Sequence, residues 1–537
     1  MKSIKLVPYL LILLLLLLGC GSDSGKKRSN TGTFPDYGLN EGDVIILEIS
    51  SPGISIGSGS SGSTDTSGST GAVTGTPGYQ KTLTVVAGTT AQLSVVARDV
   101  SGNSYTDVKV TWASDNKSVA TVDSTTGKVT GVSAGSATIT AKLTMIDGTV
   151  INDSILVTVL PSPVGYKTWI TADVKLPQPI WDHASAIWNG YIYVAGGNSS
   201  CDGNYQDCGF TKKISYARIN QDGSIGVFNP AVSLPKTLRG HSMLAYNGYL
   251  YLIGGIVQPQ YGAPPYPDQA NFETILNEEV FYSVINPDGS IGEWIKTASL
   301  PPPEKGIAPE KAGLFAQSAT VHNGYLYVTG GWSVALKKNV RNLLIGVINK
   351  DDGSILTWVH NPNLDLPYDL SKHVTVAVTV NGDNYLYIIG GNSGAIGTQS
   401  FHKEIYFAKI ADDGIPNNWT LSSSFLPVQL IDHAATSAGR YIIVTGGRDG
   451  DDSVPHKIYP NVYIYFINNS GNLELLDSYT TTMPSPLFHH AAVADKNTAT
   501  GAINIYVTGG AGGDTEQKEN RKDSVYYLTE AITEANP

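Results

Sequence analysis

The chain has 537 residues and a formal net charge of −11, with 35 Lys and Arg against 46 Asp and Glu. No basic cluster stands out in the domains beyond the leader, which argues against nucleic acid as a partner. The length leaves room for several domains, and composition changes along the chain mark where they begin.

Residues 1–20 form a targeting segment. Lys2 and Lys5 precede a leucine run from Leu10 to Leu18, which is short for a membrane span and favours a cleaved signal. Leu17-Leu18-Gly19-Cys20 resembles a bacterial lipobox, which implies cleavage before Cys20 and a lipid anchor on it. An ordinary secretory signal with an incidental Cys is the alternative. In both cases the mature protein leaves the cytoplasm, and Gly21 after the Cys favours the outer membrane or cell surface of a bacterium.

Residues 21–78 are dominated by Gly, Ser and Thr, as in the stretch 57–64. Such a composition buries too little apolar surface to offset the entropy of ordering, so a flexible tether is expected. One apolar island, residues 43–49, is compatible with a strand docked on a neighbour.

Residues 79–161 predict a small β-sandwich, because Val108–Trp112 and Ala137–Ala141 alternate apolar and polar residues between turns. The segments Trp112–Asn116, Val119–Val122 and Thr126–Ala141 resemble a bacterial immunoglobulin-like domain of group 2. The resemblance implies an adhesin module or a spacer. Trp112 is then expected in the core of the sandwich.

A strand-like segment ending in Gly-Gly recurs six times in residues 164–531. The six pairs end at Gly197, Gly255, Gly331, Gly391, Gly447 and Gly510. Each copy predicts four strands, with an Asp-Gly hairpin turn before the fourth in most copies and Trp294, Trp358 or Trp419 in that strand. Repeats of this kind stack their apolar faces, and four antiparallel strands used six times describe a six-bladed β-propeller.

The two ends of this array are out of phase. Trp169 lies in a fourth strand without a third, and Ser524–Leu528 is a third strand without a fourth. We expect the two to complete one blade and to remove an exposed sheet edge. The fold predicted for the whole chain is all-β, with the sandwich preceding the propeller.

The Gly-Gly pairs, a Tyr in the third strand and a Trp in the fourth resemble kelch repeats over roughly Tyr166 to Ala531. Phe228 and Leu476 stand where the first and fifth copies lack the Trp. The resemblance implies a propeller whose loops bind ligands at the mouths of a central channel.

Cys201 and Cys208 lie together in the insert after the first Gly-Gly. In an oxidising compartment they are expected to form a disulfide that pins one loop. A metal site of two Cys without a nearby His is the weaker alternative.

Inserted loops carry the other candidates for binding. Residues 258–267, with Tyr261 and Tyr266, form a stiff Pro- and Tyr-rich loop, residues 301–305 a second, and Arg448 and Asp449 begin a third. Asp449, Asp451 and Asp452 suggest calcium only weakly, because the spacing and the closing Glu of a calcium loop are missing.

A His or Gln opens each repeat, so we expect these six side chains to lie symmetrically about the channel. Six such side chains suggest a metal or anion site, but repetition in every blade favours a structural hydrogen bond between blades. The residues are His183, His241, Gln317, His373, His433 and His490.

The expected function is that of a lipid-anchored envelope protein whose propeller loops bind a protein or glycan, with adhesion as one use. The alternative is an extracytoplasmic sugar-modifying enzyme. Galactose oxidases, which have a kelch propeller, need copper and a Cys crosslinked to a Tyr. Cys201 and Cys208 share one loop and are expected to pair with each other, so neither is expected to form such a crosslink. Bacterial sialic acid epimerases, also kelch propellers, call for convergent Arg, and only Arg239 and Lys372 precede the first strands. No cofactor is assigned, and a structural envelope protein without a ligand is the third hypothesis.

Overall fold

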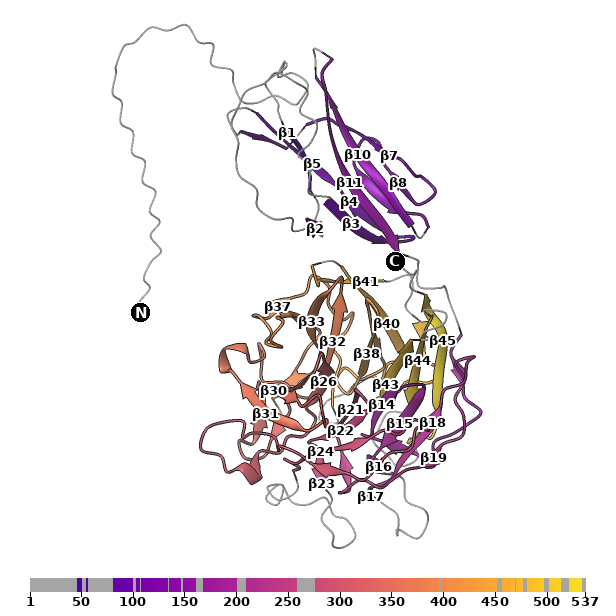
Figure 1. Ribbon diagram of the computed structural model, residues 1–537, viewed down its shortest axis with the longest axis vertical. Coiled ribbons are helices and arrows are strands. Elements are labelled where there is room, and N and C mark those ends of the chain that lie inside the picture. The colour runs from indigo at the N-terminus through magenta and orange to yellow at the C-terminus, as the bar shows by residue number, and fades with distance from the viewer. Residues whose placement is uncertain are drawn as a thin grey trace, which may run out of the picture.

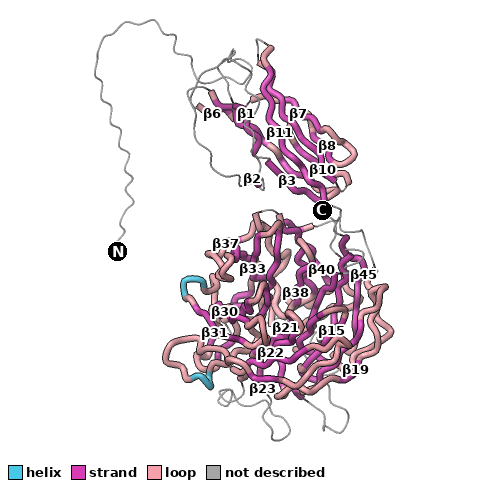
Figure 2. The backbone as a smooth tube through the Cα atoms, in the orientation of Figure 1, coloured by secondary structure: helices cyan, strands magenta, loops and turns pink. Residues whose placement is uncertain are grey.

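The chain was analysed as a computed structural model, which describes residues 46–50, 55–56, 81–99, 103–106, 108–133, 135–145, 148–160, 168–199, 209–257, 276–395, 398–451, 456–468, 470–476, 481–496, 502–512 and 521–533. A β-sandwich and a six-bladed propeller make up the fold, with two 3₁₀ turns, η2 (Pro309–Lys311) and η3 (Pro362–Leu364) (Figures 1 and 2). Within these residues no helix is long and apolar enough to cross a membrane.

The sandwich consists of one five-stranded sheet, in the order β2-β3-β11-β10-β7, and two three-stranded sheets, β1-β5-β6 and β4-β9-β8. All pairs are antiparallel except β3 with β11. The strands are β1 (Ile46–Ser50), β2 (Ser55–Ile56), β3 (Lys81–Val86), β4 (Thr90–Gln92), β5 (Ser94–Arg98), β6 (Ser104–Tyr105), β7 (Thr111–Ser114), β8 (Ala120–Val122), β9 (Lys128–Gly131), β10 (Gly135–Thr144) and β11 (Val150–Leu160).

The apolar residues that alternate with polar ones along the strands meet in one core. Trp112 lies in this core and is 5% exposed, as predicted. Leu47 and Ile49 of β1 belong to the same core. The sandwich therefore includes the apolar island that the sequence left undecided, and begins upstream of residue 79. A carboxylate oxygen of Asp153 fixes this strand, accepting from the Ile49 backbone N–H and the Lys81 ammonium at 2.6 Å each.

Each propeller blade is a four-stranded antiparallel sheet, and the first strand lies innermost (Figure 1). In blade order the strands are β14 (Ala184–Trp188), β15 (Tyr191–Ala195), β18 (Ile214–Arg218), β19 (Asn229–Pro230); β21 (Ser242–Tyr246), β22 (Tyr249–Ile253), β24 (Val280–Val284), β25 (Ile295–Lys296); β26 (Ser318–His322), β27 (Tyr325–Thr329), β30 (Leu343–Ile348), β31 (Ile355–His360); β32 (Val374–Val380), β33 (Asp383–Ile389), β36 (Ile405–Ile410), β37 (Thr420–Leu421); β38 (Ala434–Ala438), β39 (Tyr441–Thr445), β40 (Asn461–Ile467), β41 (Leu473–Leu475), with β42 (Thr481–Thr482) also on β40; and β43 (Ala491–Lys496), β44 (Ala502–Thr508), β45 (Val525–Thr533), β12 (Ile170–Thr171).

The last blade closes the ring as the phase of the repeats predicts. Its outermost strand, β12, comes from the start of the propeller and pairs with β45 from its end, with Ile170 opposite Tyr527. The sixth sheet is therefore complete only when both ends of the array meet.

A buried tyrosine of the second strand links most blades to the next. The hydroxyls of Tyr193, Tyr251, Tyr327, Tyr387 and Tyr506 donate to the carbonyl of the turn Gly in the following blade at 2.8–3.0 Å. Ile443 occupies this position in the fifth blade. The tyrosines thus combine apolar packing between blades with one satisfied buried hydroxyl each.

The two ends of the propeller differ. The loops between second and third strands, and those leading into the next blade, share one end, which we call the loop face. Short strands decorate it: β13 (Ile180–Trp181), β16 (Asn198–Ser199), β17 (Gly209–Phe210), β20 (Leu238–Arg239), β23 (Ile256–Val257), β28 (Trp332–Ser333), β29 (Lys338–Asn339), β34 (Asn392–Ser393) and β35 (Ser400–Phe401). Those labelled in Figure 1, such as β17 and β23, lie at the end away from the sandwich.

Candidate functional site

Six residues, one from each blade, surround the channel at the loop face, each directly before the His or Gln that opens the blade. All adopt left-handed backbone conformations with φ between 53° and 56°, and five are not glycine. These channel-mouth residues are Asp182, Gly240, Ala316, Lys372, Asp432 and His489. Each non-glycine residue in this region costs of order 1 kcal/mol, so the mouth stores backbone strain of the kind that marks functional sites.

Backbone hydrogen bonds join these residues around the axis. Five consecutive N–H to carbonyl links run from Lys372 through Ala316, Gly240, Asp182 and His489 to Asp432, at 2.9–3.4 Å. Between Lys372 and Asp432 the side chains meet, with Nζ 3.5 Å from Oδ2. The circular chain of bonds explains why the strained conformations are tolerated.

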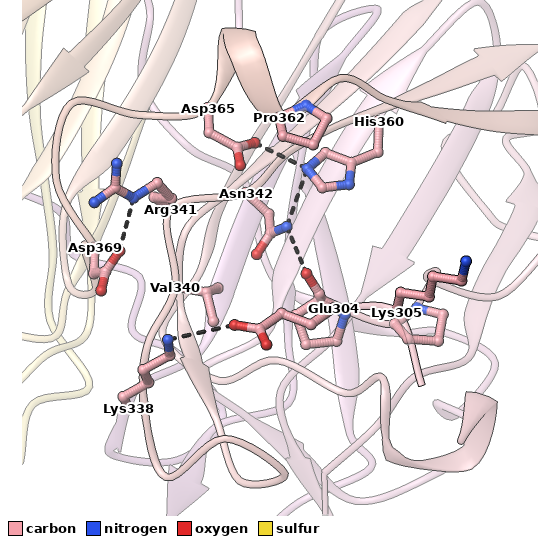
Figure 3. Close-up of a pocket in the computed structure, with 12 residues that line it drawn as sticks. Glu304, Lys305, Lys338, Val340, Arg341, Asn342, His360, Pro362, Asp365 and Asp369 are labelled. Atoms are coloured by element: carbon pink, nitrogen blue, oxygen red, sulfur yellow. Dashed lines mark hydrogen bonds and ion pairs between the residues drawn. The ribbon is translucent and has the colours of Figure 1, made fainter. Parts of the chain in front are cut away.

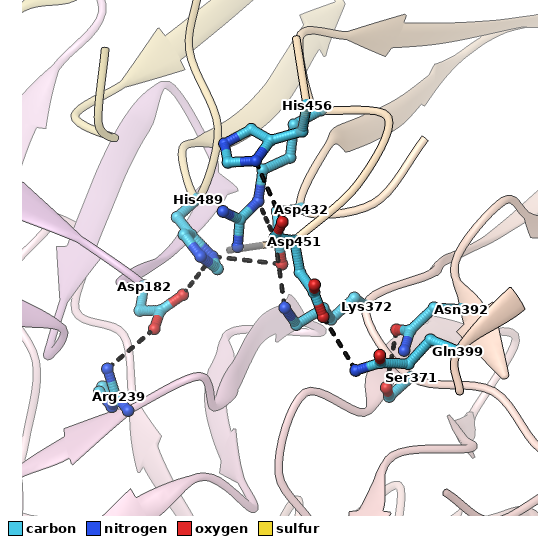
Figure 4. Close-up of polar contacts among 11 residues, drawn as sticks. Asp182, Arg239, Ser371, Lys372, Asn392, Gln399, Asp432, Asp451, His456 and His489 are labelled. Carbon is cyan, nitrogen blue, oxygen red and sulfur yellow. Dashed lines mark hydrogen bonds and ion pairs between the residues drawn. The ribbon is translucent and has the colours of Figure 1, made fainter. Parts of the chain in front are cut away.

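An imidazole between two buried carboxylates lies at the centre of the mouth (Figure 4). Nδ1 of His489 is 2.6 Å from Oδ1 of Asp182 and 3.4 Å from Oδ1 of Asp432. Carboxylate oxygens can only accept, so these contacts require a proton on Nδ1.

Three permanent cations converge on the same two carboxylates. Nε of Arg448 lies 2.8 Å from Oδ2 of Asp432, and NH1 of Arg239 lies 3.6 Å from Oδ2 of Asp182. Lys372 contacts Asp432 as described above. Among the described residues, three cations thus contact two carboxylates here, although the whole chain carries a net charge of −11.

The electrostatic balance keeps both carboxylates ionised. Burial by itself raises the pKa of Asp182, but His489 and Arg239 outweigh burial and hold this pKa below its ordinary value. Burial of Asp432 is opposed in the same way by His489, Lys372 and Arg448, and the pKa of Asp432 falls well below its usual range.

The mouth opens into a cavity of about 160 Å³, lined by the channel-mouth residues, Phe315 and the His/Gln series. Asp432 lines the cavity with a side chain only 3% exposed, and Arg448, 1% exposed, contacts it from outside the lining. Lys372 and Arg239 are more accessible, at 22% and 15%. The geometry fits a small ligand group of negative charge or high polarity, approached from the loop face.

The His/Gln series lies just inside these residues, and every member is buried. Each side chain reaches the residue that precedes Gly-Gly in the preceding blade. His183, His373 and His490 bond the hydroxyls of Thr508, Thr329 and Thr445 at 2.8–2.9 Å, Gln317 donates to the Ile253 carbonyl at 2.9 Å, and His241 and His433 interact with the backbone of Ala195 and Ile389.

The Gly-Gly pairs make room for this series. A Cβ on Gly330 would lie 2.7 Å from the His373 ring of the next blade, and a Cβ on Gly331 would lie 2.9 Å from Gln317 in its own blade. Corresponding clashes occur in the other five copies. The repeated Gly-Gly is therefore required by the imidazole or amide on either side of it.

Burial keeps the histidines of the series neutral. It lowers the pKa of His183 and His433 to about 4, and that of His241, His373 and His490 to about 3. Each ring serves a separate inter-blade contact, and among the described residues no group of three or more His, Cys, Asp or Glu is arranged to hold a metal ion.

Arg448 and the acidic residues after it do not form the exposed loop that the sequence suggested. Arg448 is buried beneath the Phe488 ring, 4.6 Å from its centroid. Asp449 accepts from the Lys457 N–H and the Tyr459 hydroxyl, at 2.6 and 2.8 Å, and Asp451 accepts from Gln399 at 2.9 Å. The carboxylates of Asp449 and Asp451 therefore stabilise the conformation of this loop.

Several predicted residues lie outside the described part of the chain: Cys20, Cys201, Cys208, Tyr261, Tyr266 and Asp452. Sequence reasoning had identified Arg239 and Lys372 but missed Asp182, Asp432 and His489. One signal was available: the position before each recurring His or Gln varies as Asp, Gly, Ala, Lys, Asp and His, while the residue after it is His or Gln in every copy.

Fold and site together define a bacterial-type immunoglobulin-like sandwich followed by a six-bladed propeller with a charged channel mouth. Residues 67–145 match the family described as bacterial Ig-like domain (group 2). This match covers β3 to β10 of the sandwich and leaves the propeller to be judged from its topology.

Two characterised proteins are similar to parts of the chain. Spermatocyte protein spe-26 of Caenorhabditis elegans is 25% identical over 237 residues, or 42% of this chain and 32% of that protein. Beta-scruin of Limulus polyphemus is 23% identical over 209 residues, or 39% and 19%. The chain thus spans about a third and about a fifth of their lengths. A solved structure, "Structure of YjhT", is 15% identical with a TM-score of 0.43, over 65% of this chain and 95% of that one.

Proposed function

We propose that this chain is a lipid-anchored protein of the bacterial cell envelope, with a kelch-type propeller that binds an anionic glycan at its channel mouth. Anchoring through Cys20 would place the sandwich between membrane and propeller, with the loop face directed outward. The leader sequence, the Gly-Gly, Tyr and Trp pattern and the match of residues 67–145 support this arrangement.

The observation that carries the binding proposal is the accessible ammonium of Lys372 in the lining of the channel-mouth cavity. The Arg239 guanidinium, 15% exposed, lies beside the same lining through its contact with Asp182, so a carboxylate of a ligand at the mouth would gain a cationic partner. The Arg239 guanidinium is held over the rings of Trp181, Phe210 and Phe315 at 4.9–5.7 Å, which preorganises it without neutralising it.

A glycan array with the chain from Gly21 onward tests the proposal. We expect sialylated or uronate-containing glycans to bind in preference to neutral ones, with affinity falling as salt rises. Lys372→Gln and Arg239→Gln should each weaken this binding by about tenfold or more. Lys350→Gln, in the turn at the opposite end of blade 3, is the matched control. Equal binding by Lys372→Gln and the control would refute the assignment.

A sugar-modifying enzyme at the same mouth is the second candidate, favoured by the position of His489 between two carboxylates. A group held there can give and accept a proton next to a bound sugar. Proton NMR of freshly dissolved N-acetylneuraminic acid would show faster equilibration of its anomers with the chain than with His489→Gln. Identical rates of anomer equilibration with the two proteins would contradict catalysis by His489 and would be compatible only with binding.

The anchor is tested separately. Cys20→Ser should move the protein from the detergent phase to the aqueous phase in a Triton X-114 partition of cells that express it. Continued membrane association of this variant would show that the leader acts only as a secretory signal.

A further inference from the structure

A second and larger cavity lies on the loop face beside blade 3, separate from the channel mouth. It measures about 510 Å³, within the range of small-molecule sites. Its walls come from three segments: residues 302–305 after blade 2, residues 338–342 before β30, and residues 360–369, which include η3 and lead into blade 4 (Figure 3).

Buried polar contacts fix the walls. The Asn342 amide, 6% exposed, donates to the Pro303 carbonyl at 2.9 Å and ties the first segment to the second. Nε2 of His360 lies 3.0 Å from Oδ1 of Asp365, and the same oxygen accepts from the Leu343 N–H at 3.0 Å. The cavity is therefore largely formed before any ligand arrives, which lowers the entropy lost on binding.

The charges that line this cavity balance. Lys305, Lys338 and Arg341 face Glu304, Asp365 and Asp369, so three cations meet three carboxylates. Nε of Arg341 is 3.0 Å from Asp369, and Nζ of Lys338 is 3.3 Å from Glu304. Because these charges cancel, the lining does not attract an anionic ligand electrostatically, in contrast to the cations at the channel mouth.

Hydrogen-bonding capacity remains after these contacts. Arg341 uses its Nε toward Asp369, and its side chain is 56% exposed, so its terminal amino groups can still donate. Each carboxylate keeps lone pairs that accept hydroxyl protons. Pro302, Pro303 and Pro362 add short apolar surfaces between the polar groups.

We infer that this cavity binds a neutral polyhydroxylated ligand, a hexose or a short neutral oligosaccharide. Hydroxyl groups both donate and accept, so they match a wall of alternating cations and carboxylates, and the ring carbons match the prolines. The inference extends the proposed function with a second, neutral subsite and does not require that the channel mouth bind an anion.

Isothermal titration calorimetry with maltotriose, cellotriose, lactose and N,N′,N″-triacetylchitotriose tests the inference on the chain from Gly21 onward. At least one of these sugars should bind, and Arg341→Leu and Asp369→Asn should each weaken that binding by about tenfold. Arg218→Leu, an exposed arginine on blade 1, is the matched control. Both test positions are exposed enough for the fold to survive, which unchanged thermal unfolding would verify.

The results separate this site from the channel mouth. Lys372→Gln should leave neutral sugar binding unchanged, whereas Arg341→Leu should leave acidic glycan binding unchanged. The inference is overturned if none of the four sugars binds at about 10 mM, if Arg341→Leu and Asp369→Asn bind like the control, or if Arg341→Leu abolishes binding of acidic glycans instead.

Discussion

The five buried histidines of the His/Gln series should make the propeller unfold at mildly acidic pH. Folding lowers their pKa values from 6.5 to between about 3 and about 4. The unfolded chain therefore takes up protons first as the pH falls. The stabilisation is complete above pH 6.5 and declines from there toward the folded pKa values.

His433 allows the magnitude to be worked out for one ring. Its pKa falls from 6.5 to about 4. At pH 5 the unfolded imidazole is 1.5 pH units below its pKa while the folded ring is still neutral, which corresponds to about 2 kcal/mol lost per histidine. Five such losses would rival a typical total stability of about 5–15 kcal/mol.

Urea unfolding followed by tryptophan fluorescence between pH 7.5 and 5 measures this loss. The chain supplies its own control residue, because Gln317 fills the same position in blade 3 and donates to the Ile253 carbonyl. His433→Gln should therefore keep the contact with Ile389 and remove one titrating group. The variant should lose about 2 kcal/mol less than the unchanged chain on acidification to pH 5.

The outcome that contradicts this reasoning is specific. If His433→Gln and the unchanged chain lose stability in parallel between pH 7.5 and 5, the buried histidines do not govern acid stability. Asp182 and Asp432 do not explain the effect in this window, because their pKa values are lowered and they lose their stabilising charge only at more acidic pH.

Three further predictions concern single contacts. Tyr251→Phe should destabilise the propeller by about 1–2 kcal/mol in urea unfolding, because the turn carbonyl of the next blade loses its buried donor; no change would mean that the hydroxyl is dispensable. Asp432→Asn should cost about 3–5 kcal/mol by removing the carboxylate charge beside the buried Arg448, and the added Arg448→Met should recover part of this loss. Gly255→Ala, whose Cβ would lie 2.9 Å from the Arg239 backbone oxygen and 2.8 Å from the His241 Cβ, should lower the melting temperature far more than Gly248→Ala, which has open space and a similar backbone conformation. Equal effects of the two substitutions would show that backbone conformation, and not space, requires the first glycine.

The repeat pattern predicted the architecture because each blade must bury both faces against its neighbours. The spacing of the Gly-Gly pairs and the split blade that unites Trp169 with Ser524–Leu528 were readable along the chain, and the pairing of β12 with β45 confirms them. The place of the apolar island at residues 43–49 could not be predicted from the repeat pattern or from its neighbours in the sequence. Only the core of the sandwich shows that Leu47 and Ile49 have a place there.

The candidate site was less predictable, because its members come from different blades. Arg239 and Lys372 were noticed as cations, but Asp182 and Asp432 are separated by 250 positions, and nothing local links them to His489. Arg448 was assigned to an acidic surface loop because its sequence neighbours are Asp and Gly. In the fold its side chain points the other way, toward Asp432 and Phe488.

The sequence by itself determined the class of both domains, the number of blades and the closure of the ring, since these depend on local periodicity and on apolar faces that must be covered. Only the tertiary structure decided which charges meet. Closing the ring brings one residue from each blade to a common axis, and it is there that His489 lies between two carboxylates. The charge at the mouth is a property of that convergence, which no stretch of the chain contains.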